Sequence, residues 1–390
     1  MRLWYPLVLS FALASSALAS SAAAQTATPQ TGQAPAQTGQ TAAPAGQAGA
    51  PAGLNEDAVL PVMQRAVDEV IRPGYRNAQQ SAARLTTAMK DLCDKGTPAS
   101  LDKAKSAFDD IIRYWSGIEM VQIGPVIQDN LFEHILFYPD RKGVGLRQVQ
   151  TLIAKADPKD TTVDAIAAKS VALQGLTALE YVLYGTGSED LTSQKGGFRC
   201  LYGAAVAGNI QREAAEVVAA WEKPDGIQAS WKHPGPQSAD FMDNKEAVTA
   251  LLGILVHGAE NVRDQRLEQF YKGKDAMPRP KMAIYWRSKN TWKSMTSNLE
   301  ALRTLWQKAQ MADLLPSDKK SVADAIDAKL KAIIETVPKL NPDIEAATSD
   351  AERAKLDQLL IDTRELVTTI SDDYGAAIGL SAGFSFSDGD

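Results

Sequence analysis

The sequence predicts an all-α protein made of two packed helical bundles, each of the four-helix type, over about residues 55–195 and 196–390. Three observations predict this fold. Apolar residues recur at every third or fourth position from Asn55 onward, which is the period of an amphipathic helix. Segments in which apolar and polar residues alternate are scarce, so strands are not expected. Glycine and proline gather in short stretches between the helical segments.

The helical segments can be placed in order. The first begins after Asn55, a residue suited to capping a helix, and its apolar face comprises Leu60, Met63, Val67, Val70 and Ile71. The second begins at Ser100, ends by Gly124-Pro125, and has an apolar face of Leu101, Ala104, Phe108, Ile111, Ile112 and Trp115. After an irregular aromatic stretch, helices are expected from Leu146 and over residues 161–184, 198–221, 243–272, 289–312, 317–336 and 349–374. The Pro- and Gly-rich segment 223–239 is expected to be a long loop.

The N-terminus has the layout of a secretory signal peptide over residues 1–24. Arg2 precedes an apolar run from Leu3 to Leu13, and small residues follow, with cleavage expected after Ala19 or Ala24. The alternative is an uncleaved membrane anchor, but the apolar run is shorter than the ~20 residues that a spanning helix needs. Residues 25–54 contain almost only Gln, Ala, Thr, Pro and Gly and are expected to form a disordered linker.

The net charge limits the class of partner. The 390 residues carry a formal charge of -6, and loss of Arg2 with the leader makes the mature chain one unit more negative. Nucleic acids and anionic membrane surfaces both require a basic footprint, so neither is expected to be the main partner. No later segment has the length and hydrophobicity of a transmembrane span.

Two cysteines, Cys93 and Cys200, are the only ones in the chain. An exported protein meets an oxidising compartment, so a disulfide between them is expected, closing a loop of 107 residues. Two separately buried thiols are the alternative. No further thiol or histidine lies at ligand spacing from either cysteine, so they are not expected to bind a metal.

Several segments resemble the imelysin family. The main one is Val171-Ala-Leu-Gln-Gly-Leu-Thr-Ala-Leu-Glu-Tyr-Val-Leu-Tyr-Gly185, which looks like the family's central helix. The others are Trp115, Glu119, Gly124-Pro125, Phe198-Arg199-Cys200 with Tyr202, Trp286-Arg287-Ser288, Asn298-Leu299-Glu300-Ala301-Leu302 and the terminal Gly383-Phe-Ser-Phe-Ser-Asp-Gly-Asp390. Together they extend the resemblance over residues 55–390.

The resemblance implies an all-α fold of two bundles in the bacterial envelope, frequently linked to iron or haem acquisition. It also implies a residue cluster between the bundles around a Gly-x-His-x-x-Glu motif, on which members have been classed as metallopeptidases. In this chain the positions that would line the site are Glu119, Gly175, Thr177, Glu180, Asp264, Arg287 and Ser288.

The motif is incomplete here. Gly175 and Glu180 match it, but Thr177 occupies the position of the histidine. A histidine and a glutamate three residues apart share a helix face and could bind one metal ion, whereas a threonine hydroxyl is a poor ligand for zinc or iron. Glu180 remains the one candidate metal ligand. Iron or another divalent metal is the one candidate cofactor. Because its neighbours on the helix are apolar, Glu180 must either point outward or be paired. Mainly on the resemblance, we favour an inward position in contact with Arg287, Thr177 or a ligand; the alternative is a solvated glutamate or a structural ion pair.

These residues leave three hypotheses for function. The first is an envelope protein of the periplasm that binds a small ligand between its bundles without catalysis, in the iron or haem uptake that the resemblance implies. The second is a metal-dependent peptidase whose missing ligand is His134 or His257. The third is a component that binds an envelope protein through its bundle surface. No H-E-x-x-H motif, nucleophile elbow or nucleotide-binding loop occurs, so no catalytic residue is assigned and the first hypothesis is favoured over an enzyme.

Overall fold

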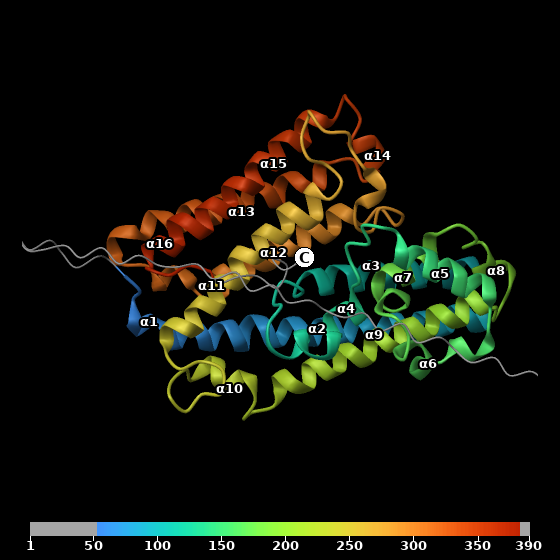
Figure 1. Cartoon of the computed structure of the whole chain (residues 1–390), viewed down its shortest axis with the longest axis horizontal. Coiled ribbons are helices and arrows are strands. Elements are labelled where there is room, and N and C mark those ends of the chain that lie inside the picture. The colour runs from blue at the N-terminus through green and yellow to red at the C-terminus, as the bar shows by residue number, and fades with distance from the viewer. Residues whose placement is uncertain (1–52, 383–390) are drawn as a thin grey trace, which may run out of the picture. The chain divides into compact units, whose positions relative to one another are not determined.

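A computed structural model describes residues 53–382 of the chain, and every regular element in this range is a helix (Figure 1). The all-α prediction is therefore confirmed. The predicted leader, nearly all of the predicted linker and the terminal motif at 383–390 lie outside the described residues. The α-helices are α1 Glu56–Arg65, α2 Arg72–Lys95, α3 Pro98–Ser116, α4 Leu131–Ile135, α5 Val144–Lys155, α6 Val163–Ala167, α7 Gly175–Tyr184, α8 Asp190–Ser193, α9 Phe198–Glu222, α10 Ile227–Lys232, α11 Asn244–Asn261, α12 Thr291–Lys308, α13 Lys320–Thr336, α14 Ile344–Ala347, α15 Arg353–Thr368 and α16 Gly375–Ala377.

Shorter helical stretches connect or extend these helices. Three are π-helical and continue an α-helix without a break: η1 Ala66–Ile71, η5 Val262–Glu268 and η10 Thr369–Tyr374. The others are 3₁₀ turns: η2 Gly124–Asn130, η3 Pro158–Thr161, η4 Val171–Leu173, η6 Pro280–Met282, η7 Met311–Leu314, η8 Ser317–Lys319 and η9 Val337–Lys339.

The beginning of α1 differs in detail from the prediction. Asn55 lies at the N-cap position, but its side chain makes no capping bond and instead donates to the carbonyl of Asp313 at 2.9 Å. Leu60 was expected on the apolar face and is 46% exposed, whereas the other predicted members of that face are buried. The long loop predicted after α9 also contains one short helix, α10.

The single long helix predicted over residues 161–184 is wrong. The chain forms α6, the turn η4 and then α7, which begins at Gly175. Gly175 has a φ of +72°, a left-handed conformation that interrupts a helix and that glycine adopts without strain. The side-chain amide of Gln174 donates to the carbonyl of Lys169 at 2.8 Å and so fixes the preceding turn. The apolar period continues across this break, which is why it could not be seen in the sequence.

Two groups of helices can be recognised from their contacts. α2 packs along α9 and α3, and α7 packs against α9. In the second group α12 contacts α11 and α13, and α13 packs along α15 (Figure 1). Contacts between α3 and α12 join the groups. The division that we place near residue 195 stays a prediction, although α9, which follows it, packs on helices that precede it.

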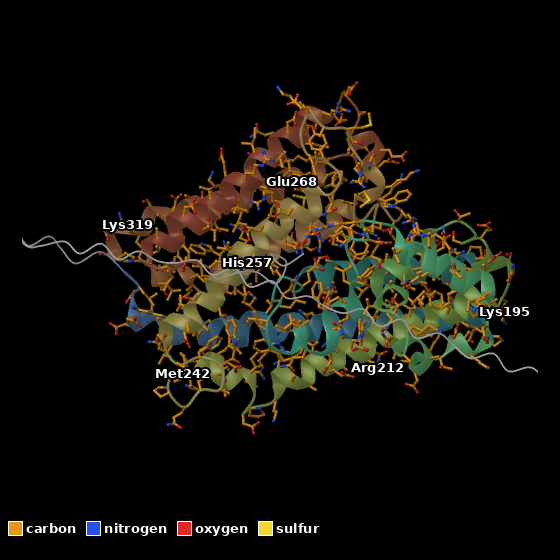
Figure 2. All side chains as sticks on the ribbon, in the orientation of Figure 1. Lys195, Arg212, Met242, His257, Glu268 and Lys319 are labelled. Atoms are coloured by element: carbon orange, nitrogen blue, oxygen red, sulfur yellow. A yellow bond between two sulfur atoms is a disulfide. The ribbon has the colours of Figure 1, made fainter. Side chains whose placement is uncertain are left out.

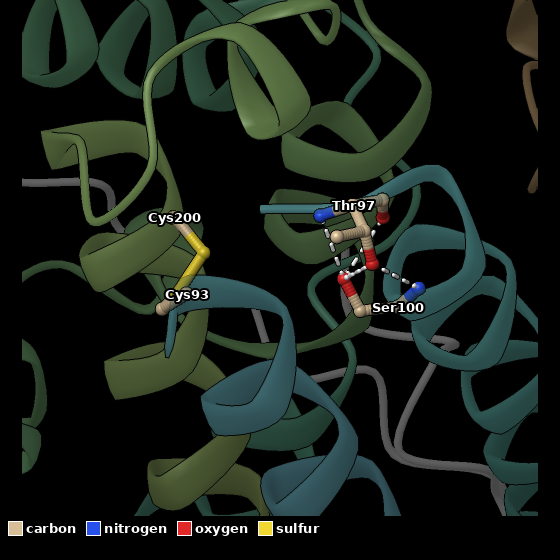
Figure 3. Close-up of a disulfide and its surroundings, with 4 residues drawn as sticks. All are labelled: Cys93, Thr97, Ser100 and Cys200. Carbon is tan, nitrogen blue, oxygen red and sulfur yellow. Dashed lines mark hydrogen bonds between the residues drawn. A yellow bond between two sulfur atoms is a disulfide. The ribbon is translucent and has the colours of Figure 1, made fainter. Parts of the chain in front are cut away.

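The predicted disulfide between Cys93 and Cys200 is confirmed, with the two Cα atoms 5.4 Å apart (Figure 3). It joins the last turn of α2 to the first turn of α9. Close by, Thr97 caps α3 by accepting a hydrogen bond from the backbone of Ser100, whose hydroxyl accepts one in return (Figure 3). No helix among residues 53–382 is both long and apolar enough to cross a membrane.

Candidate functional site

The carboxylate of Glu180 points into the protein from the middle of α7, and the residue is only 3% exposed. Its Oε1 accepts hydrogen bonds from the backbone N–H of Ser288 at 2.9 Å and from the Ser288 hydroxyl at 2.8 Å. The guanidinium of Arg287 lies 4.0 Å from Oε2. Burial raises the pKa of Glu180 above its ordinary value, while Ser288 and the charge of Arg287 lower it by less. The inward position that we predicted for Glu180 is the one the structure has.

The segment just before α12 has an unusual backbone. Tyr285 and Lys289 have φ angles of +53° and +59°, a left-handed region that is unfavourable for residues with a Cβ. The N–H of Asn290 donates to the carbonyl of Tyr285 at 3.1 Å and closes the turn between them. This turn aims the N–H and hydroxyl of Ser288 at Glu180, so local backbone strain accompanies the contact between α7 and the segment before α12.

α7 is held at both ends by α9. At its N-terminal side, the Tyr202 hydroxyl donates to the carbonyl of Leu173 at 2.8 Å. At its C-terminal end, the buried guanidinium of Arg199 donates to the carbonyls of Tyr181 at 2.6 Å, Val182 at 2.9 Å and Thr186 at 2.8 Å. A cation placed at the carbonyls of a helix C-terminal end is favourable, because the helix dipole leaves partial negative charge there. Arg199 and Tyr202 on α9 therefore help to fix the position of α7, the helix that carries Glu180.

A pocket of about 220 Å³ lies over Glu180 and Thr177. Its walls come from the segment 137–149, from Ala172 and α7, and from residues 281–287. Apolar and aromatic side chains make up much of the lining: Phe137, Leu146, Val149, Met282, Ile284 and Trp286. The charged side chains that line it are those of Asp140, Glu180, Lys281 and Arg287. A small apolar cavity with a few polar groups is the usual form of a ligand site.

Arg287 makes cation–π contacts with two aromatic rings at the pocket wall. Its guanidinium carbon lies 4.4 Å from the ring centre of Trp286 and 5.5 Å from that of Tyr181. Burial lowers the pKa of Arg287, and the negative charge of Glu180 opposes this effect. The 4.0 Å separation from Glu180 is too long for a hydrogen bond, so this pair interacts mainly through charge.

Glu119 belongs to a second buried cluster. Its Oε1 accepts hydrogen bonds from Arg266 Nη2 at 2.5 Å and from Asn298 Nδ2 at 2.7 Å, and Arg266 Nε donates to Asn298 Oδ1 at 3.1 Å. All three residues are buried. Burial lowers the pKa of Arg266, the charge and hydrogen bond of Glu119 raise it, and the pKa lies above its ordinary value overall. Arg266 lies in the π-helical η5, whose wider winding carries this side chain into the core.

Tyr285 lies between the two clusters. It lines the pocket over Glu180, and its pKa is raised well above the ordinary value by burial and by the charge of Glu119. Among the described residues, neither the Tyr285 hydroxyl nor Glu119 Oε2 has a hydrogen-bond partner, although both atoms are buried. The nearby hydroxyl of Tyr138 donates to the carbonyls of Gln265 and Met282 at 3.0 and 2.9 Å.

Comparisons with known proteins agree with this architecture. The family model described as Imelysin matches residues 71–370, most of the chain. The chain belongs to the imelysin family. An imelysin-like protein from Psychrobacter arcticum 273-4 has a solved structure with a TM-score of 0.71 and 17% identity, covering 85% of this chain and 99% of that one. A second, from Parabacteroides distasonis ATCC 8503 and provisionally named an iron-regulated protein A precursor, has a TM-score of 0.66 and 15% identity over 83% and 95% of the two chains. At these identities the structures support the fold alone. A search among curated proteins finds no match.

The residues expected at the imelysin site are only partly together. Thr177, Glu180 and Arg287 line one pocket and Ser288 binds Glu180 directly. Thr177, at the histidine position of the imelysin motif, donates its hydroxyl to the carbonyl of Phe137 at 3.1 Å. Asp264 does not line this pocket, and its half-exposed carboxylate pairs with the neighbouring Arg263 at 2.5 Å.

Gly175, the glycine of the motif, allows close packing of α4 on α7. A Cβ at this position would lie 2.5 Å from the carbonyl oxygen of Ile135 and 2.8 Å from that of His134. The absence of a side chain therefore lets the end of α4 pack directly on the start of α7, the helix that carries Thr177 and Glu180.

The two histidines proposed as substitute metal ligands make other contacts. His134 Nδ1 lies 3.5 Å from Glu213 on α9. His257 is on α11 (Figure 2). Its Nδ1 lies 2.9 Å from Glu260. Neither histidine lines the pocket over Glu180. Within residues 53–382 no group of three or more His, Cys, Asp or Glu side chains is arranged to hold a metal ion. The ligand set that the peptidase hypothesis needs is not assembled by these side chains.

Several residues of the site were not predicted. Trp286 directly precedes Arg287, and Tyr181 directly follows Glu180, so both could have been expected near the site. That Tyr181 lies over Arg287 could not be inferred from the sequence. Arg266 is 147 residues from Glu119, and the spacing of charges gave no signal for that pair. The left-handed conformation of Tyr285 also has no signature in the sequence, because aromatic residues seldom adopt it.

Proposed function

We propose that this imelysin-family chain is an exported envelope protein that binds a small ligand in the pocket over Glu180, in a role associated with iron or haem acquisition. The observation that carries the proposal is Glu180 itself, a buried acid held by Ser288 at the wall of a small, mostly apolar pocket. A buried ionisable group in a pocket is a recognised mark of a functional site. The name of the Parabacteroides neighbour, an iron-regulated protein, supports the association with iron.

The proposal is tested by filling the pocket. Thr177 lines it, so Thr177→Phe should occupy part of the space and abolish binding of pocket ligands. The matched control is Thr151→Phe, the same substitution at an exposed position of α5 outside this pocket. Calorimetric titration with ferrous iron, zinc, haem and small organic acids should give at least one ligand whose binding is lost in Thr177→Phe and kept in Thr151→Phe. If every ligand binds both variants equally, or none binds the wild type, the pocket is not the binding site.

A second substitution separates metal binding from other ligands. Thr177→His would place an imidazole one helical turn before Glu180, as in the family motif. If the pocket keeps the geometry of a metal site, affinity for transition metals should rise by at least about tenfold, ~1.4 kcal/mol. Thr177→Ala should leave any weak metal binding unchanged because a hydroxyl contributes little to a metal bond. Loss of tight metal binding in Thr177→Ala would show that this threonine is a ligand after all.

The proposal also includes export. Cleavage of the leader should give a mature protein that begins near Ser20 or Gln25 and is recovered from the periplasm. N-terminal sequencing and cell fractionation measure both. An intact N-terminus starting at Met1 in the membrane fraction would contradict this part of the proposal.

A further inference from the structure

The charged side chains at the pocket over Glu180 differ in whether they have hydrogen-bond partners. Among the described residues, the Arg287 guanidinium makes no hydrogen bond, although its side chain is only 21% exposed. The guanidinium lies over the rings of Trp286 and Tyr181, and these contacts use its positive charge and leave its five N–H donors available. Arg287 is therefore a positioned cation with unused donors.

The acids of the same pocket are already engaged. Both oxygens of Asp140 accept hydrogen bonds from backbone N–H groups at the start of α5, from Val144 at 2.8 Å and from Leu146 at 3.0 Å. Glu180 Oε1 accepts two hydrogen bonds from Ser288. The main group still available to bind a ligand is thus the Arg287 guanidinium, a cationic hydrogen-bond donor. A cationic donor favours an anion over a metal ion.

Resting on the proposed binding function, we infer that the ligand of this pocket is a small organic carboxylate whose carboxylate binds Arg287 and whose apolar body packs on the surrounding side chains. A carboxylate matches the planar fork of a guanidinium and can accept two parallel hydrogen bonds from it. Phe137, Met282 and Trp286 provide the apolar surface for the rest of the molecule. Lys281, exposed at the pocket, adds a second positive charge.

The charge of Glu180 distinguishes this arrangement from a metal site. Its Oε2 lies 4.0 Å from the Arg287 guanidinium and interacts with that positive charge. A bound carboxylate would compete with Glu180 for the same cation. Removing that competing charge should therefore strengthen the binding of a carboxylate. The same change would weaken the binding of a metal cation, because it removes the only candidate ligand on α7.

The experiment is calorimetric titration of the purified mature protein with acetate, hexanoate, benzoate and phenylacetate, with benzamide as the uncharged analogue of benzoate. We expect at least one carboxylate to bind, and benzamide to bind at least tenfold more weakly than benzoate. Arg287→Gln should weaken carboxylate binding by at least about tenfold, the effect of losing a charged hydrogen bond. Arg287→Lys should lose part of the affinity because it keeps the charge without the fork. Glu180→Gln should bind carboxylates more tightly than the wild type.

The matched control is Arg113→Gln, which removes an exposed arginine that also stacks on an aromatic ring, 4.2 Å from the centre of Tyr114, and does not line this pocket. It should leave carboxylate affinity unchanged. Thermal melting of every variant shows whether it is folded.

Three outcomes would overturn the inference. Benzamide binding as tightly as benzoate, with both lost in Thr177→Phe, would leave the pocket a ligand site but not an anion site. Metal binding that is lost in Glu180→Gln, without any carboxylate binding, would do the same. If no carboxylate binds and no other ligand depends on Thr177, both the inference and the proposed function fail.

Discussion

Replacing Gly175 by alanine should be one of the most damaging single-methyl additions to this chain. At φ +72° an L-residue is strained by about 1–2 kcal/mol. The new Cβ would also lie 2.5 Å from the Ile135 carbonyl oxygen and 2.8 Å from that of His134. Because both are backbone atoms, they cannot rotate away, and α4 or α7 must move. Overpacking of this kind costs about 1–3 kcal/mol, so the total is about 2–5 kcal/mol.

Gly379 provides the matched control. Its φ is +69°, but no atom of residues 53–382 lies within 4 Å of a Cβ added there, so Gly379→Ala should cost only the backbone strain of about 1–2 kcal/mol. The unfolding entropy of the roughly 330 described residues is about 0.7 kcal/mol/K, at about 2.1 cal/mol/K per residue. Gly175→Ala should then lower Tm by about 3–7 °C, and Gly379→Ala by about 1.5–3 °C.

Differential scanning calorimetry of the two variants and the wild type measures these shifts. Equal shifts in the two variants would mean that the close approach of α4 to Gly175 contributes nothing, and the reasoning would be refuted. A larger shift in Gly175→Ala should be accompanied by weaker ligand binding, because α7 carries both Thr177 and Glu180.

Three further predictions concern stability. Glu119→Gln leaves the buried charge of Arg266 without a counter-charge and should destabilise the protein by about 3–5 kcal/mol, whereas Asp327→Asn, in the partly exposed pair with Arg303, should cost less than about 1 kcal/mol in the same urea titration. Burial raises the pKa of Glu180 above 4.5, so the folded protein loses stability as pH rises from 4.5 through the raised pKa. The Tm of Glu180→Gln minus that of the wild type should therefore increase between pH 4 and pH 8. A difference that decreases with pH would contradict this sign. Cys93→Ser with Cys200→Ser should cost about 4 kcal/mol for a 107-residue separation, and rapid alkylation of both thiols in the untreated protein would show that the bridge is absent.

The helical period of the sequence predicted the class of fold and most of the long helices, since burial of one helix face leaves a local, repeating pattern. α9 was placed to within one residue of its C-terminal end. The same reasoning failed at Gly175, where the apolar pattern continues across a break caused by one backbone dihedral angle. That angle is compatible with glycine but not required by it, so residue type alone could not locate the end of the helix.

The inward position of Glu180 and the loop closed by Cys93 and Cys200 were within reach of the sequence, because an acid among apolar neighbours and an isolated cysteine pair each have few physical solutions. The partners of buried charges were not. Ser288 is 108 residues from Glu180, and Arg266 is 147 residues from Glu119. Burial requires that each such charge be paired, but helix packing decides which distant side chain comes within hydrogen-bonding distance. Tertiary structure alone therefore joined Glu119 to Arg266 and placed Arg287 beside Glu180 with its donors unbonded among the described residues.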